Sequence, residues 1–168
     1  QILGRCWPLQ VGCGYLAQFL PPPPSAPETD DAKCRLRTGA VVYVPPDDFV
    51  GRALFYFGDL DPKLTWLLQR LVHSGDTVID IGANLGLSTF AAAAEVGATG
   101  AVHAFEPQPS MVRRLRESRD ANSFANVHIH PVALGSHTHT TDLYVPPGNK
   151  GAASLNRRHR PNGHHVSV

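Results

Sequence analysis

A glycine-containing loop that follows a short apolar run constrains the fold of this chain more than any other feature. The run is Thr77-Val78-Ile79-Asp80-Ile81, and the loop continues to Gly86. The next stretch, residues 87–96, is rich in alanine and favours a helix. A strand, a glycine loop and a helix in this order place the loop at the carboxyl end of a buried parallel strand, where ligands bind in open α/β sheets.

The pattern repeats along the next fifty residues. Ala101 to Phe105 reads as a second buried strand, Ser110 is a candidate cap for a second helix, and Asn126 to Leu134 reads as a third strand. Near-continuous apolar runs are typical of strands covered on both faces, so we expect Phe105 and the alanines at 91–94 in the core. The fold class predicted is α/β, with three parallel strands and their helices.

Two segments precede this unit. Residues 1–37, with four consecutive prolines at 21–24, are predicted to form a tail or linker. Residues 38–76 are predicted to form an extension with two strands, at 40–44 and 52–57, and a helix around 64–72 that Asp61 caps and that packs against a sheet. Residues 77–168 then form a partial cofactor-binding domain.

Composition narrows the classes of partner. The net charge of +1 gives no overall field for nucleic acid, which favours a small-molecule partner. No apolar run is long enough to span a membrane and no signal peptide is evident, so we expect a cytoplasmic protein. Three cysteines without metal-site spacing are expected to be free thiols. The first residue is Gln1, which suggests a fragment or a processed product.

Two acidic residues and two glycines form the candidate ligand site. Gly82 allows a tight turn, and Gly86 allows the helix to begin close to the strand. Asp80 places a carboxylate beside the loop, which suits an amine-bearing ligand better than a pyrophosphate. Glu106 ends the second strand, where an acid can accept hydrogen bonds from both hydroxyls of a ribose. A nicotinamide cofactor would need a glycine where Asn84 stands, so hydride transfer by an NAD-dependent oxidoreductase is the weaker alternative.

Residues 38–145 resemble the FkbM-type family of class I methyltransferases. The resemblance is carried by Gly75-Asp76, by residues 78–86, by Ala104-Phe105-Glu106-Pro107-Gln108-Pro109, and by Asn126-Val127 leading to Val132-Ala133-Leu134-Gly135. It implies a Rossmann-like fold and S-adenosylmethionine as the cofactor. It also implies that the loop residues Gly82, Ala83, Asn84 and Gly86 contact the methionine part, that Asp80 lies near the amino group and Glu106 holds the ribose, and that Ala133 borders the adenine.

The resemblance further implies methyl transfer to an oxygen of a small metabolite, sugar or lipid, and it assigns no catalytic residue. It places the next buried strand beyond Val168, so the class I fold is expected to be incomplete, with the first strand at an exposed edge. Oligomeric state is left open.

Other interpretations remain beside this one. The acids could only cap helices and the glycines only serve packing, and the chain could be a noncatalytic nucleoside-binding remnant. The histidines at 128, 130, 137 and 139 have a spacing that could bind a metal, although no metal site is expected because no carboxylate or cysteine completes it. The basic run Arg157-Arg158-His159-Arg160 is interpreted as a solvated loop.

Overall fold

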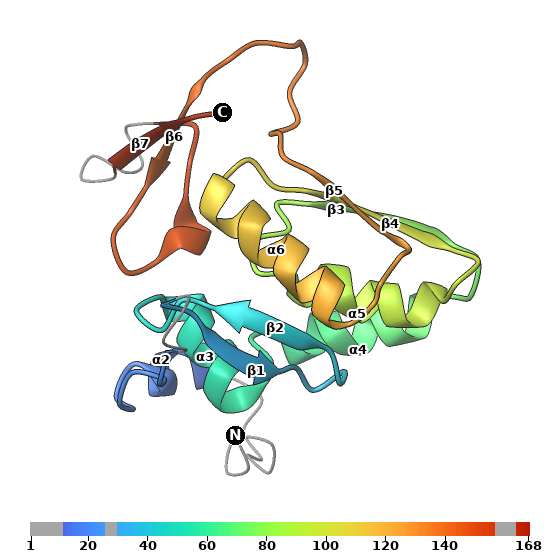
Figure 1. Cartoon of the computed structure of the whole chain (residues 1–168), viewed down its shortest axis with the longest axis horizontal. Helices are drawn as coiled ribbons and strands as arrows, with labels where there is room; N and C mark the ends of the chain where they lie inside the picture. Colours follow the sequence, from blue (N-terminus) through green and yellow to red (C-terminus); the bar gives the residue numbers. More distant parts are fainter. Residues whose placement is uncertain (1–11, 26–29, 157–163) are drawn as a thin grey trace.

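A three-stranded parallel sheet carries the glycine loop. The computed structural model describes residues 12–25, 30–156 and 164–168 (Figure 1). The strands lie in the order β3 (Thr77–Ile81), β4 (Ala101–Phe105) and β5 (Val127–His130), and they are joined by α5 (Leu87–Val96) and α6 (Pro109–Ala121). This arrangement confirms the predicted α/β class. The third strand is shorter than predicted, because it ends before Pro131, and Gln108 rather than Ser110 occupies the cap position of α6.

Only one face of this sheet is covered in the described part of the chain. Val102 and Val127 are buried against alanines of α5, and Ala104 is buried against α6 side chains, so both helices lie on the same side (Figure 1). On the other face, Ile79 and Ile81 are 62% and 68% exposed. The prediction of strands buried on both faces is therefore wrong for the described residues.

The open face of the sheet also carries an aromatic group. Phe105, predicted to lie in the core, is half-buried and stacks on His130 with ring centroids 4.5 Å apart. His103 donates or accepts a hydrogen bond with His130 at 3.0 Å and stacks on His128. Phe105 is on this face because side chains of a strand alternate, and its neighbour Ala104 takes the helix-covered side.

An antiparallel hairpin packs beside α6. Its strands are β1 (Ala32–Arg35) and β2 (Val41–Val44), so the first strand lies within the segment predicted as a tail. The amide of Tyr43 donates to the Ser118 hydroxyl at 3.1 Å, and the amide of Val41 donates to the Asn122 side chain at 2.8 Å. The hairpin is thus attached to the helix rather than to the central sheet.

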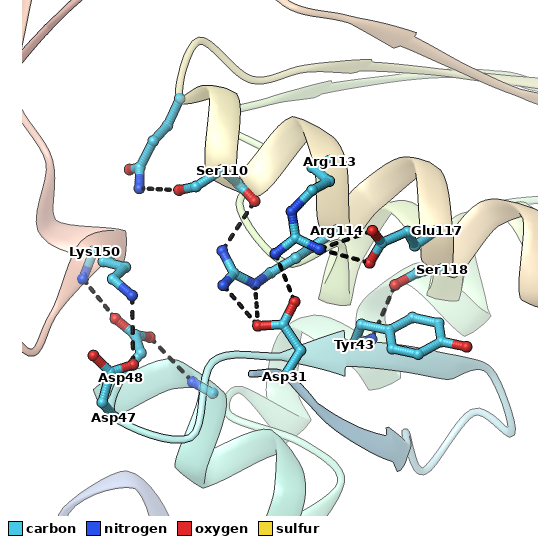
Figure 2. A network of polar contacts seen from close by, with 12 residues as sticks. Asp31, Tyr43, Asp47, Asp48, Ser110, Arg113, Arg114, Glu117, Ser118 and Lys150 are labelled. Atoms are coloured by element: carbon cyan, nitrogen blue, oxygen red, sulfur yellow. Dashed lines mark hydrogen bonds and ion pairs between the residues drawn. The ribbon is translucent and has the colours of Figure 1, made fainter. Parts of the chain in front are cut away.

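A buried ion pair strengthens this attachment. Asp31 has no exposed surface and accepts hydrogen bonds from Arg114 Nε at 2.9 Å and Nη2 at 2.7 Å (Figure 2). Arg113 donates to the other carboxylate oxygen at 2.7 Å and also pairs with Glu117. Both oxygens of a carboxylate that water cannot reach are therefore satisfied, as burial of a charge requires.

The predicted strand at 52–57 is wrong, because these residues belong to a helix, α3 (Phe49–Phe57). Asp48 caps it by accepting from the amides of Val50 and Gly51, and the buried side chains Ala53, Leu54 and Phe57 have helical spacing. The short helix α2 (Cys13–Ala17), also within the predicted tail, contacts α3, and Arg52 donates to the Ala17 carbonyl at 3.1 Å.

Helix α4 (Pro62–Leu71) begins where predicted but packs differently. The Asp61 carboxylate accepts from the Leu64 amide at 3.2 Å, which confirms the predicted cap. The helix packs against α5 rather than on a sheet, and Thr65 is its one buried residue. Leu64, Leu67 and Leu71 are exposed, so three of the apolar residues that predicted this helix face solvent, while Val72, just after the helix, packs against the core.

The last described elements form a second hairpin beyond α6. Its strands are β6 (Asp142–Val145) and β7 (His164–Ser167), which pair antiparallel, and a 3-10 turn, Lys150–Ala152, lies between them. None of the helices in the described ranges combines the length and the apolar character needed to cross a bilayer.

Candidate functional site

The glycine loop joins the ends of the first two parallel strands. The amides of Gly82 and Ala83 both donate to the Phe105 carbonyl, at 2.9 and 3.0 Å, which fixes the loop to the end of β4. Gly82, Asn84 and Gly86 have φ values of +84°, +50° and +84°. Every second residue of the loop therefore has a left-handed backbone. Glycine and asparagine adopt this conformation at lower cost than other residues do.

Gly86 has a second reason to be glycine. A Cβ atom there would lie 2.7 Å from a ring carbon of Phe90 and 2.8 Å from a methyl group of Leu115. The missing side chain lets α5 begin against the side chains that fill the space under the loop. Ala83 is likewise buried in this core, so both residues support the loop from below.

Glu106 is held at the centre of the site. Its Oε2 accepts from the Asn84 amide and its Oε1 from the Gln108 amide, each at 2.8 Å, and the residue is 7% exposed. Burial raises the pKa of Glu106 above its ordinary value, and these two amides oppose that shift. Each carboxylate oxygen keeps a lone pair beyond the amide that it accepts, so a ligand hydroxyl can still bind.

Asp80 lies near Glu106 but faces another way. It is on the helix-covered side of β3, and its Oδ2 accepts from the Thr89 hydroxyl, in the first turn of α5, at 2.5 Å. Burial raises the pKa of Asp80, and the hydrogen bonds from Thr89 oppose the shift. The carboxylate thus acts at the start of α5, which is the helix-capping role weighed as the alternative for both acids.

A cavity of about 150 Å³ lies in front of Glu106. Three predicted site residues line it, Gly82, Asn84 and Glu106. The remaining lining residues are Pro107, Gln108, Met111, Leu143, Lys150, Gly151 and Ala153. Ligand pockets in proteins generally hold roughly 300 Å³ or more, so this cavity has room for part of a nucleoside, such as a ribose.

The other predicted residues are placed elsewhere. Asp80 in β3 and the loop residues Ala83 and Gly86 do not line this cavity. Ala133 lies in a separate hollow formed by residues 132–139 with Leu155 and Val168. The adenine contact of Ala133 stays a prediction.

The structure adds residues from far along the chain to the site. Lys150, Gly151 and Ala153 reach the cavity from the 3-10 turn, more than sixty residues after the glycine loop. No periodicity or motif marks this stretch, although a Pro-Pro-Gly turn precedes its small residues. The role of this stretch in the cavity follows only from the packing of the turn against α3, which the sequence does not indicate.

The histidines do not gather into a metal centre in the described part of the chain. No group of three or more His, Cys, Asp or Glu side chains there is arranged to hold a metal ion. His128 and His130 share the open face of the sheet as predicted, while His137 and His139 stack on each other in the loop that follows. The basic run Arg157-Arg158-His159-Arg160 lies outside the described residues.

Comparison with known families decides the family of this chain. A family described as the methyltransferase FkbM domain matches residues 80–167, which is more than half of the chain and begins at Asp80. The chain belongs to the FkbM methyltransferase family. The resemblance seen in the sequence is thereby confirmed.

Solved structures of methyltransferases are also similar to the FkbM chain. An S-adenosylmethionine-dependent methyltransferase from Aquifex aeolicus is 22% identical over 50% of this chain and 42% of that chain, with a TM-score of 0.39. An S-adenosylmethionine-dependent O-methyltransferase from Thermotoga maritima is 20% identical over 60% of this chain and 40% of that chain, with a TM-score of 0.42. The chain thus spans less than half the length of either. No curated protein matches it significantly.

Proposed function

We propose that this chain binds S-adenosylmethionine through the Gly82–Gly86 loop and Glu106, as the cofactor half of a methyltransferase. The observation that supports this most is Glu106, a nearly buried carboxylate with free lone pairs, facing a cavity at the carboxyl end of the sheet. Carboxylates at this place in α/β folds accept hydrogen bonds from ribose hydroxyls. The loop residues Gly82 and Asn84 form the neighbouring wall, where the methionine part would lie.

The residues present fit such a cofactor. The side-chain oxygen of Asn84 is buried and has no hydrogen-bond partner among the described residues. A buried acceptor without a partner costs free energy, and a ligand donor would remove that cost. When bound, the cofactor supplies an electrophilic methyl group on a sulfonium. The role of this chain is to hold the cofactor so that the acceptor atom can approach in line with the bond between sulfur and the methyl group. Such positioning by itself lowers the activation barrier of methyl transfer substantially.

We infer an oxygen acceptor on a small metabolite, a sugar or a lipid, from membership in the FkbM family alone. No described residue is assigned as the base that would take the proton of a hydroxyl acceptor. The inference is tested by incubating the chain with cofactor carrying a labelled methyl group and a panel of hydroxylated small molecules. Label in a base-stable ether supports it, whereas label on nitrogen or carbon would contradict it.

Calorimetric titration tests the cofactor proposal directly. S-adenosylhomocysteine and NAD are titrated separately into the chain and into a Glu106→Ala variant. Saturable binding of S-adenosylhomocysteine that weakens at least tenfold in the variant is the expected result, since the loss of charged hydrogen bonds costs about 1.5–3 kcal/mol. Binding of NAD alone would overturn the proposal, and so would binding of neither ligand by a folded sample.

A further inference from the structure

Residues 148–153, here called the roof turn, form one wall of the Glu106 cavity. Its residues Lys150, Gly151 and Ala153 line the cavity. In Figure 1 the roof turn comes from the orange part of the chain and lies between α6 and the α3 region. The cofactor loop and the roof turn are distant in sequence, so their contact depends on what fastens the turn.

The roof turn is fastened to the start of α3. Asp48 is fully buried, and while its Oδ2 caps α3, its Oδ1 accepts from the Lys150 amide at 2.6 Å (Figure 2). The Phe49 amide donates to the Gly148 carbonyl at 2.9 Å, and the Lys150 ammonium group pairs with Asp47 at 3.4 Å. One buried carboxylate therefore holds the helix and the turn in a fixed relation.

Gly151 then meets the cofactor loop at close range. A Cβ atom at this position would lie 2.5 Å from Asn84 Nδ2 and 3.1 Å from a methyl group of Val50. The backbone of Gly151 is not left-handed, so its conformation does not require glycine. What requires glycine is the space taken by the Asn84 carboxamide.

Asn84 in turn has an unused acceptor. Its backbone amide is bound to Glu106, which holds the residue beside the ribose position, and its side-chain oxygen is buried without a partner among the described residues. We propose that Gly151 is a positioning residue of the cofactor site, which leaves room for the Asn84 carboxamide so that its oxygen accepts a hydrogen bond from an N–H or O–H group of the cofactor. This inference rests on the proposed function and extends it to the roof turn.

The test is a double-mutant cycle read by calorimetry with S-adenosylhomocysteine. Gly151→Ala pushes the Asn84 side chain aside, and Asn84→Gly removes that side chain while keeping a residue suited to positive φ. Each variant is expected to bind about tenfold more weakly, the loss of roughly one hydrogen bond to a charged or polar donor. Adding Gly151→Ala to Asn84→Gly should weaken binding no further, because both act through the same group.

Control measurements separate positioning from folding. Arg116→Ala changes an exposed residue of α6 that does not line the cavity, and it should bind like the parent chain. Melting temperatures of all variants should lie within a few degrees of one another. A second ligand, 5′-methylthioadenosine, lacks the amino-acid part. If Asn84→Gly weakens only S-adenosylhomocysteine, the donor is the ammonium group, and if it weakens both, the donor belongs to the nucleoside part.

Three outcomes would overturn the inference while the parent chain still binds S-adenosylhomocysteine. Unchanged affinity of Gly151→Ala is the first. A full loss on adding Gly151→Ala to Asn84→Gly is the second, since it would place the effect on Val50 instead. Unchanged affinity of Asn84→Gly for both ligands is the third. Absence of binding by the parent chain is a separate result that defeats the proposed function itself.

Discussion

Asp80 and Glu106 are both acids at strand ends, and burial raises the pKa of each. Their surroundings nevertheless give them different roles. Asp80 lies on the covered side of the sheet, where Thr89 binds its carboxylate. Glu106 faces the cavity, and among the described residues it is bound by two amides of the neighbouring backbone. Glu106 is the acid that can still accept hydrogen bonds from a ligand in the cavity. The pH dependence of ligand binding should therefore reflect the titration of Glu106.

The affinity for S-adenosylhomocysteine should fall in mildly acidic solution. Ribose hydroxyls donate to the ionised Glu106 carboxylate, and burial raises the pKa of this group, so protonation begins at a higher pH than for an exposed glutamate. Affinity is thus fully present above the raised pKa and is lost as pH falls through it. Calorimetry over a pH series checks this.

Glu106→Gln is the control for that series. It should bind more weakly at neutral pH and show a flatter profile, because the titrating group is gone. An equally steep acid loss in Glu106→Gln would assign the effect to another group, with Asp80→Asn as the next variant to test.

Cys34 should be unreactive in the folded chain. It is 4% exposed in β1, and burial raises the pKa of its thiol to about 12, so almost no reactive thiolate forms near neutral pH. Mass spectrometry of peptides after brief iodoacetamide treatment should find Cys34 unlabelled under native conditions and labelled in denaturant. Rapid native labelling would contradict the burial of β1.

Part of this site could be read from the sequence because its signals are local. Gly82 and Glu106 each follow directly from the end of a strand and Gly86 directly precedes α5, so spacing alone brings them to one sheet edge. Gly151 could not be found this way, because what makes it necessary is the Asn84 side chain, a contact made through tertiary packing.

Helices and strands with local sequence signals were predicted correctly, and those that depend on tertiary packing were not. The strands β3 and β4 and the helix α5 have the bounds expected from their apolar patterns. Residues 52–57 are rich in aromatic and aliphatic side chains, which favour strands, but the Asp48 cap and burial on one helical face decide for α3. The strand that pairs with β2 is Ala32–Arg35. Its polar residues give no strand pattern in the sequence, and the attachment of the hairpin to α6 depends on contacts between residues far apart in the chain.

The attachment of the hairpin to α6 should depend on Arg114. Arg114→Met leaves the buried Asp31 with one partner fewer, and breaking a buried pair costs about 3–5 kcal/mol. Urea denaturation should show a loss of unfolding free energy near the lower figure, because Arg113 still binds Asp31.

Arg116→Met is the matched control on the same helix. Arg116 is exposed, and its replacement should change the unfolding free energy by less than about 0.5 kcal/mol. Equal effects of the two substitutions would show that the Asp31 contact contributes no more than a surface charge does.

The whole molecule is asymmetric about its parallel sheet. Two helices cover one face, while the other face presents isoleucine, phenylalanine and histidine side chains that no described element covers. Among the described strands, β3 lies at one edge of this sheet. Contiguous exposed apolar surface of this kind promotes association.

Replacing two residues of the open face should reduce that association. Ile79→Thr with Ile81→Thr removes apolar surface that is mostly exposed and keeps β-branched residues suited to a strand. The double variant should bind less of the dye ANS and show a smaller aggregated fraction by light scattering, with little change in melting temperature. A large fall in melting temperature would mean that both side chains are buried in solution.

The buried Asp31 has a consequence for synthesis of the chain. Its partners Arg113 and Arg114 lie more than eighty residues later, and the hydrogen bonds of the hairpin to α6 span similar separations. During synthesis the hairpin is made before α6, so the Asp31 carboxylate has no counter-charge until Arg113 and Arg114 follow. The packing of the hairpin can therefore be completed only after α6 has been synthesised, and such contacts between distant parts of the sequence slow folding.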